Sequence, residues 1–91
     1  MKLLYSPIFM RASKRLFKRN PSFLQVVPAV LRTLEADMFS PSLRTHKLKG
    51  KFKDYWSCSV VRDIRIVFKI VKDGNEDAIL LQTIGTHDEV Y

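Results

Sequence analysis

The side chains best suited to chemistry in this chain are its only two histidines, His46 and His87. An imidazole has an unperturbed pKa of about 6.5, so it can both accept and donate a proton near neutral pH. His46 lies in a basic segment, and His87 follows a strongly apolar run that ends at Ile84. Both fall outside the predicted cores. Two idle surface histidines would give the same pattern, so spacing alone leaves both interpretations open.

Positive charge is the dominant feature of the composition. The chain holds 16 Lys and Arg against 9 Asp and Glu, which gives a formal net charge of +7, and its pI is near 9.9. These cations cluster at residues 11–19, 44–53 and 62–72. Clustering of this kind favours a polyanionic partner, with nucleic acid as the first candidate, over a charge that serves solubility alone.

Cleavage of RNA without a metal is one reaction that two histidines and nearby arginines can perform. It requires a base that removes the 2′-hydroxyl proton, an acid that protonates the departing 5′-oxygen, and cations that offset charge on the phosphorane. A module that only binds RNA is the alternative. Tyr55, Trp56 and Tyr91 can stack on unpaired bases, at roughly 1 to 3 kcal/mol per base. Tyr91 is the preferred stacking residue, because a tryptophan that opens a strand more often serves packing.

Other chemistries lack the residues that they need. A metal site would require His46, His87 and Asp63 to converge without any closely spaced ligand pair, so no metal is expected. The single cysteine, Cys58, falls within a predicted strand, and the chain has no Gly-x-Ser-x-Gly motif of a serine hydrolase. Three isolated glycines do not make a phosphate-binding loop, so no cofactor is expected either.

The length of 91 residues, with 46% hydrophobic and 27% charged residues, predicts one folded domain spanning residues 1–91. Ser6-Pro7 interrupts the apolar N-terminus and Arg11 follows soon after, a pattern unlike a signal peptide. No apolar stretch is long enough to span a bilayer. These features predict a cytoplasmic protein without a membrane partner.

Two helices are predicted in the first half of the chain. Ser6-Pro7 supplies an N-cap followed by proline at the first helical position. Apolar residues then recur at helical spacing from Ile8 to Phe17, with Lys and Arg between them, so this helix is basic and amphipathic. Asn20-Pro21 repeats the capping signal for a second helix that continues toward Met38. Pro28 predicts a kink or a delayed start in that helix.

Four strands complete the predicted fold. One covers residues 3–5, and three runs rich in Val, Ile and Phe cover residues 56–61, 64–72 and 78–84. Turns at Arg62-Asp63 and at residues 73–75 join the last three strands into an antiparallel meander. Residues 43–54 have no periodicity and are expected to form a basic loop. The predicted class is α+β, in the order β-α-α-β-β-β, with a helical hairpin packed on an antiparallel sheet.

A period of two assigns the faces of the middle strand. The face expected to pack against the helices carries Ile64, Ile66, Phe68 and Ile70. The other face, expected to be half exposed and available to phosphate, carries Arg65, Val67, Lys69 and Val71. Residues 84–91 follow the last strand. They either hold His87 and Tyr91 in a functional position or form a solvated tail after a strand that stops at Gly85.

Three local signatures carry a resemblance that covers essentially the whole chain. They are residues 46–50 (HKLKG), residues 59–67 (SVVRDIRIV) and Gly85-Thr86-His87 before the terminal Tyr91. In combination they resemble the RelE/ParE-type bacterial toxins, most closely the YafQ-like branch. The resemblance implies a RelE-like microbial ribonuclease fold and a toxin of a type II toxin-antitoxin system. Such a toxin enters the ribosomal A site and cleaves messenger RNA, and translation and growth then stop.

The resemblance also implies partners: messenger RNA, the ribosome, whose RNA the basic helix and loop would grip, and a cognate antitoxin. The antitoxin is expected to be acidic and to be encoded beside the toxin. The alternative within the same superfamily is a ParE-type toxin that inhibits gyrase and has no nuclease activity, for which the histidines have no acid-base task.

Site residues follow from the resemblance, position by position. His87 matches the general acid or base after the last strand, His46 the loop histidine, and Asp63 the acidic residue of the hairpin turn. Arg65 matches a basic position near the scissile phosphate, and Tyr91 the C-terminal aromatic residue. Further RNA contacts are expected from Lys47, Lys49, Arg62, Ser59 and Trp56. Ser59 stands where the YafQ-like branch carries another histidine, and because serine does not titrate near pH 7, the acid-base work falls on the other residues.

Overall fold

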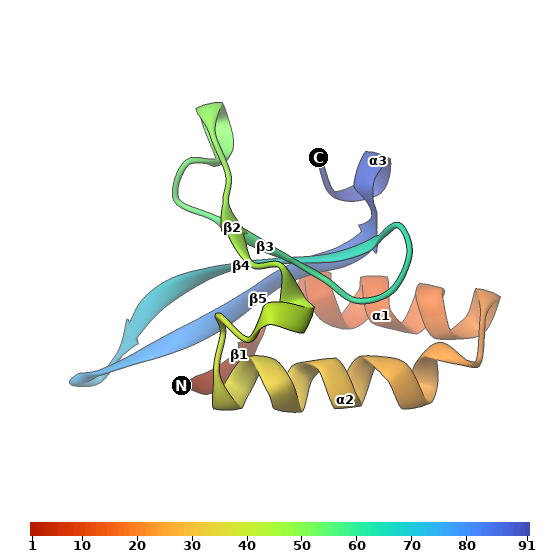
Figure 1. Cartoon of the computed structure of the whole chain (residues 1–91), viewed down its shortest axis with the longest axis horizontal. Helices are drawn as coiled ribbons and strands as arrows, with labels where there is room; N and C mark the ends of the chain where they lie inside the picture. Colours follow the sequence, from red (N-terminus) through yellow and green to blue (C-terminus); the bar gives the residue numbers. More distant parts are fainter.

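The computed structural model describes all 91 residues and has the predicted α+β class. Five strands form one sheet in the order β1-β5-β4-β3-β2. Helices α1 and α2 lie against one face of this sheet, while α3 and the segment around β2 lie on the other face (Figure 1). The elements are β1 (Lys2–Tyr5), α1 (Pro7–Arg19), α2 (Phe23–Ala36), β2 (His46–Lys47), β3 (Trp56–Ser59), β4 (Ile64–Asp73), β5 (Glu76–Thr86) and α3 (His87–Val90), with 3-10 turns η1 (Pro41–Leu43) and η2 (Gly50–Phe52).

Helix α1 begins where the sequence predicts it. Ser6 is the N-cap, its Oγ accepts a hydrogen bond from the Phe9 amide at 3.0 Å, and Pro7 occupies the first helical position. Because proline has no amide hydrogen, it loses nothing at a position where that hydrogen would have no partner. The buried stripe of α1 holds Phe9, Ala12 and Leu16, which confirms an amphipathic helix. Ile8, the first residue of the predicted apolar face, is 45% exposed and lies outside the stripe.

Helix α2 begins at Phe23 and runs through Pro28, so the start is not delayed to the proline. Its N-cap is Ser22, whereas Asn20, the predicted cap, accepts hydrogen bonds at Oδ1 from the Ser22 amide at 3.3 Å and from the Ser22 hydroxyl at 2.7 Å. A proline in a helix interior removes one backbone hydrogen bond. The burial of Phe23, Val27 and Leu34 on the sheet offsets this loss.

The sheet is mixed, which corrects the expectation of an antiparallel sheet in one respect. Strands β2 to β5 pair antiparallel as predicted, but β1 pairs parallel with β5, with Leu3 opposite Ile79. Two helices separate β1 from the other strands, and a long crossover of this kind permits a parallel pair. Helix packing decides the edge at which β1 is added, and a strand pattern does not contain that information.

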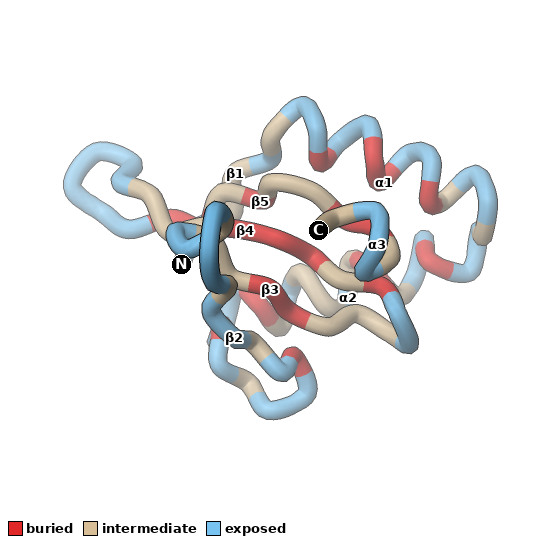
Figure 2. The backbone as a smooth tube through the Cα atoms, turned by 90° about the horizontal axis from the view of Figure 1, so that it is seen from above, coloured by how far each residue is buried: buried red, intermediate tan, exposed pale blue.

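The hydrophobic core lies between the helices and the sheet. Ile64, Ile66 and Phe68 belong to this core and Ile70 packs at its margin, as the alternation predicts. Buried residues run along the middle of β3 and β4 (Figure 2). The prediction for Val67 is wrong, because this side chain is only 3% exposed although it lies on the opposite face. The reason is that Phe52, Tyr55 and the C-terminal segment cover that part of the sheet and line a hollow with Val67.

The segment of residues 43–54, predicted as a plain loop, contains a short edge strand. His46 pairs with Ser57 and Lys47 with Trp56, so the two-residue strand β2 adds an edge strand to the sheet beside β3. Strand β3 ends at Ser59, two residues earlier than predicted. The Arg62-Asp63 turn is confirmed, since the Ile64 amide donates to the Val61 carbonyl at 3.0 Å across it.

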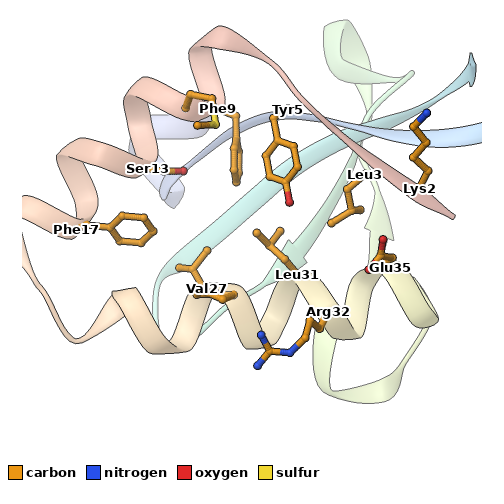
Figure 3. A pocket seen from close by; sticks show the side chains of 12 residues that line it. Lys2, Leu3, Tyr5, Phe9, Ser13, Phe17, Val27, Leu31, Arg32 and Glu35 are labelled. Atoms are coloured by element: carbon orange, nitrogen blue, oxygen red, sulfur yellow. The ribbon is translucent and has the colours of Figure 1, made fainter.

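A groove of about 500 Å³ lies between α1, α2 and β1, on the helical side of the molecule (Figure 3). The Ser13 hydroxyl points into it, is 7% exposed and has no hydrogen-bond partner. Arg32 and Glu35 lie on the α2 side of this groove. Neither histidine lines it. No helix of the protein is both long enough and apolar enough to cross a membrane.

Candidate functional site: two histidines on the outer face of the sheet

The chain after β5 is a short helix and not a solvated tail. Strand β5 continues to Thr86, two residues beyond the predicted end at Ile84, and α3 follows at once. Thr86 and Glu89 form a reciprocal capping box. The Thr86 amide donates to Glu89 Oε1 at 2.8 Å, and the Glu89 amide donates to Thr86 Oγ1 at 3.3 Å. The local pattern of threonine followed three residues later by glutamate is a known helix-start signal, so the sequence contained this element.

Glu89 also links α3 to the first helix. Its Oε2 lies 3.3 Å from Arg19 Nη2 at the end of α1. The hydrogen bond from the Thr86 amide, together with the Arg19 charge, lowers the pKa of the Glu89 carboxyl from its ordinary value. Both side chains are well exposed, so the ion pair contributes little to global stability. Its importance is local, because it restrains the turn that carries His87.

Gly85 lets α3 fold back closely over the end of β5. A Cβ at this position would lie 3.0 Å from Glu89 Oε1 and 3.2 Å from Glu89 Cβ. These distances are shorter than most real Cβ contacts, so a larger residue would make Glu89 shift by a few tenths of an ångström within the capping box. The close approach of the helix therefore favours glycine here.

The terminal residue Tyr91 is tied to the sheet. Its hydroxyl donates a hydrogen bond to the Oγ of Ser57, a serine of β3 that is completely buried. Its ring meets the His87 ring edge-on, with centroids 4.6 Å apart and an interplanar angle of 76°. This contact fixes the imidazole relative to β3. Tyr91 therefore caps the fold, in addition to any role in stacking.

His46 lies on the same face of the sheet, at the edge formed by β2. Its Nδ1 lies 3.1 Å from the Arg44 carbonyl oxygen. A carbonyl oxygen only accepts hydrogen bonds, so Nδ1 carries the proton in the neutral ring and Nε2 keeps a free lone pair. The ring is exposed. A free Nε2 on an exposed ring is the arrangement that a general base needs.

Strand register brings these side chains together. His46, Ser57, Val67 and Thr83 are successive partners across β2, β3, β4 and β5, so they share one face. Two residues further along, Ser59, Arg65 and Gly85 form the next row on that face. Above these rows lies a hollow of about 440 Å³, which we call the two-histidine pocket. It is lined by His46, Leu48, Lys49, Phe52, Arg65, His87 and Tyr91.

Three of the four predicted catalytic residues thus line one pocket, and the fourth does not. Arg65 is half-buried, and its Nη1 donates to the carbonyls of Arg62 at 2.8 Å and Ile64 at 3.3 Å, which fixes the guanidinium. Asp63 lies exposed in the hairpin turn, outside the pocket lining. The sequence placed it close to Arg65 in the chain, but the turn holds it away from the histidines.

The predicted RNA-binding residues divide in the same way. Lys49 and Tyr91 line the pocket. Trp56 pairs with Phe68 on the core face, where its ring meets Phe39 edge-on at 5.5 Å, and Lys47 Nζ lies 5.8 Å from the same ring. Both side chains are therefore on the other side of the sheet from His46.

The two remaining predicted contacts lie next to the pocket. Ser59 is half-buried opposite Arg65, and Arg62 is exposed in the turn. Neither lines the pocket. Two residues of the pocket were missed by sequence reasoning, Leu48 and Phe52. An aromatic residue between Lys51 and Lys53 was the available signal, because basic segments with an aromatic residue are typical of single-stranded nucleic-acid binding.

The polar side chains that line the pocket can transfer protons or carry positive charge. Nowhere in the chain do three or more His, Cys, Asp or Glu side chains come together as a metal site would require. The single thiol, Cys58, is buried on the core face, and burial raises its pKa to about 12, so it is not a nucleophile at neutral pH. What the pocket presents to solvent is two imidazoles, one fixed guanidinium, one lysine and an aromatic wall.

Known proteins show the same fold. A copper-bound mutant toxin from Helicobacter pylori superposes with a TM-score of 0.80 at 28% identity, covering 100% of this chain and 99% of that one. YafQ from E. coli strain BL21(DE3) gives a TM-score of 0.79 at 17% identity, with 99% and 97% covered. YafQ within the E. coli DinJ-YafQ complex gives 0.71 at 22% identity, with 99% and 97% covered.

No curated protein matches this sequence. The family description "Bacterial toxin of type II toxin-antitoxin system, YafQ" matches residues 1–91, the whole chain. The chain therefore belongs to the YafQ family of type II toxins, the branch that its sequence signatures most closely resemble.

Proposed function

We propose that this toxin is a metal-independent endoribonuclease that cleaves messenger RNA on the ribosome. The observation that carries the proposal is the convergence of His46, His87 and Arg65 on one open pocket. Two imidazoles provide a base and an acid, and a guanidinium provides the fixed charge that phosphoryl chemistry needs. Membership of a toxin family supports the biological setting.

The hydrogen bonds of the two rings suggest separate roles. Nε2 of His46 is free because Nδ1 donates to the Arg44 carbonyl, so it can accept the 2′-hydroxyl proton. Nδ1 of His87 lies 3.5 Å from a carboxylate oxygen of Asp88, which can accept a hydrogen bond from an Nδ1 proton. A protonated His87 can then release the Nε2 proton to the departing 5′-oxygen. After attack, one ring has gained a proton and the other has lost one.

The remaining pocket residues hold the substrate. Arg65 is anchored by two carbonyls and can offset charge on the phosphorane, and Lys49 adds a second cation at the pocket wall. Phe52 and Tyr91 offer aromatic surface to an unpaired base. Asp63 and Ser59, outside the lining, are expected to act on RNA outside the reacting phosphate. The core contacts of Trp56 favour packing over base stacking.

The basic surface suits a ribosomal setting. The last turns of α1 carry Arg15, Lys18 and Arg19 around a shallow hollow next to Glu89. Arg19 also forms the ion pair with Glu89 that links α1 to α3. A net charge of +7 favours ribosomal RNA and also an acidic antitoxin. A solved relative of this fold, YafQ, forms a complex with DinJ. We infer that this chain is likewise held inactive by an antitoxin, in the cytoplasm.

The test is inducible expression of the parent, His46→Ala, His87→Ala and Arg65→Ala in growing bacteria. Each variant should lose cleavage by about 100-fold or more, the usual effect of removing an acid or base. Arg32→Ala, an exposed arginine on α2, is the matched control for the lost cation. Cleavage sites are mapped by primer extension on a translated message and on the same RNA without ribosomes. The purified toxin is added either directly or after dialysis against EDTA.

Cleavage of the translated message only, equal for toxin with and without prior dialysis against EDTA, is the expected result. If the histidine variants cleave like the parent, the assigned site is wrong. If DNA damage precedes any loss of message in the parent, a gyrase-directed toxin replaces the proposal. RNA binding without cleavage in the parent would reduce the protein to a binding module.

A further inference from the structure

Ser57 is one of two buried serines, and the proposed chemistry does not use it. It is completely buried at the centre of the outer face of the sheet. Its Oγ has one side-chain partner, the hydroxyl of Tyr91. Buried polar groups lower stability unless they are paired, and a small apolar residue would pack equally well at this position. The hydroxyl of Ser57 is therefore not explained by packing. Its hydrogen-bond partner, Tyr91, also contacts His87.

Tyr91 connects Ser57 to His87. The Tyr91 ring meets the His87 imidazole edge-on at 4.6 Å, and no other hydrogen bond joins these two side chains to the sheet. Ser57 is also the backbone partner of His46 in the β2–β3 pair. Ser57 is thus connected to both histidines. Its backbone pairs with His46, and its hydroxyl is linked to His87 through Tyr91.

Helix α3 needs such a link because it is too short to hold a ring in place by itself. It comprises four residues, His87–Val90. Isolated helices far longer than this are marginal in water. The capping box fixes the start of α3, and the Tyr91 hydroxyl fixes its end. An exposed imidazole at the first position, with only a 3.5 Å contact to Asp88, depends on both ends.

We infer that Ser57 is a positioning residue: its hydroxyl holds Tyr91, and the Tyr91 ring holds the His87 imidazole at the distance from His46 that the reaction needs. The inference rests on the proposed nuclease function for its catalytic meaning. The geometric part, a serine that sets the orientation of His87, stands without it. Loss of the hydrogen bond should therefore lower kcat and leave substrate binding nearly unchanged, because Ser57 itself is covered and cannot touch RNA.

The experiment removes the hydrogen bond from each side. Ser57→Ala deletes the acceptor in the sheet, and Tyr91→Phe deletes the donor but keeps the ring. The double variant completes a cycle. Ser13→Ala is the matched control, a second buried serine whose hydroxyl has no partner. All are compared as full-length proteins by the ¹H–¹³C signals of the His87 ring and by kcat and KM for cleavage of a translated message.

Ser57→Ala and Tyr91→Phe should each shift and broaden the His87 ring signals and lower kcat by about tenfold, an effect in the range expected for a misplaced catalytic group. KM should stay within about twofold. The double variant should be no worse than either single variant, because both remove the same bond. Ser13→Ala should leave the His87 signals and kcat unchanged.

Unchanged His87 signals in Ser57→Ala overturn the inference, whatever the activity. Shifted signals with an unchanged kcat overturn its catalytic part. An effect of Ser57→Ala that Tyr91→Phe does not reproduce overturns the hydrogen bond as the route. If the parent does not cleave RNA, the proposed function fails, but the ring signals still decide whether Ser57 positions His87.

Discussion

Gly85→Ala is a one-methyl change that tests whether close packing of α3 is required for activity. The added Cβ would lie 3.0 Å from Glu89 Oε1, 3.2 Å from Glu89 Cβ and 3.4 Å from a methyl carbon of Val90. The backbone of Gly85 is in a region open to all residues, so alanine adds a steric clash and no dihedral strain. The Glu89 side chain is held by the Thr86 amide and by Arg19, and it must shift by a few tenths of an ångström against those contacts to make room.

The size of the stability loss depends on how far Glu89 and α3 can move to accommodate the added methyl group. Overpacking a fixed site costs about 1–3 kcal/mol, and loss of a capping interaction costs about 1 kcal/mol. Because α3 is four residues long and its Glu89 is exposed, the helix can move away from β5 and relieve the clash. This movement limits the loss in the free energy of unfolding. We expect the free energy of unfolding to fall by about 1–2 kcal/mol, with Tm lower by about 4–8 °C per kcal/mol. The position of His87 should change at the same time.

Gly74→Ala is the control that separates stability from site geometry. Gly74 has φ +67° at the far turn of the β4–β5 hairpin, and a Cβ there would meet nothing within 4 Å. Alanine in that left-handed conformation costs roughly 1–2 kcal/mol, a similar loss of stability with α3 untouched.

The assay measures thermal unfolding and message cleavage for both variants. Gly85→Ala should lose cleavage by at least tenfold more than Gly74→Ala at equal stability. If both variants retain equal cleavage, the docking of α3 on Gly85 has no part in the function, and the reasoning is refuted.

Three further predictions concern single groups. The lowered pKa of Glu89 means that its stabilisation of the capping box is present above the ordinary carboxyl pKa of about 4.3 and is lost as pH falls through the lowered value. The Thr86 amide signal should therefore move only below that ordinary pKa, and a shift between pH 5 and 7 would contradict this. Cys58, whose pKa is raised to about 12 by burial, should resist Ellman's reagent at pH 8 until urea unfolds the protein, and rapid labelling of the native state would count against the packing described. Ser13→Ala should raise the free energy of unfolding by about 0.5–1 kcal/mol, because it removes an unpaired buried hydroxyl and improves helix propensity; a lower Tm would show that the hydroxyl has a partner.

Elements that depend on local chemistry were predictable from the sequence. Ser6-Pro7 marks the start of α1 because capping uses only neighbouring residues. The alternation from Ile64 to Phe68 identifies the core face because one face of the sheet is covered by helices. Strand β2 was not predictable, since two polar residues have no period and become a strand only by pairing with Trp56 and Ser57.

The candidate site was predictable in part, and for a different reason. Spacing gave no basis for bringing His46 and His87 together, 41 positions apart in the sequence; the resemblance to a toxin family supplied that expectation. The absence of Asp63 from the pocket, and the presence of Phe52, follow from the directions of a turn and a 3-10 segment. The direction of Phe52 depends on its packing against Val67 and Tyr55, which no local pattern specifies.

The position of His87 separates the stability of this protein from its proposed activity. The core between the helices and the sheet contains no residue of α3, so the fold does not require that helix. Helix α3 instead depends on three links: the capping box, the Arg19–Glu89 pair, and the Tyr91–Ser57 hydrogen bond. Each link is weak by itself, and together they set one imidazole. Substitutions at these links should therefore lower cleavage by about tenfold or more with a smaller fall in Tm than core substitutions cause, whereas core substitutions should lower Tm and cleavage together.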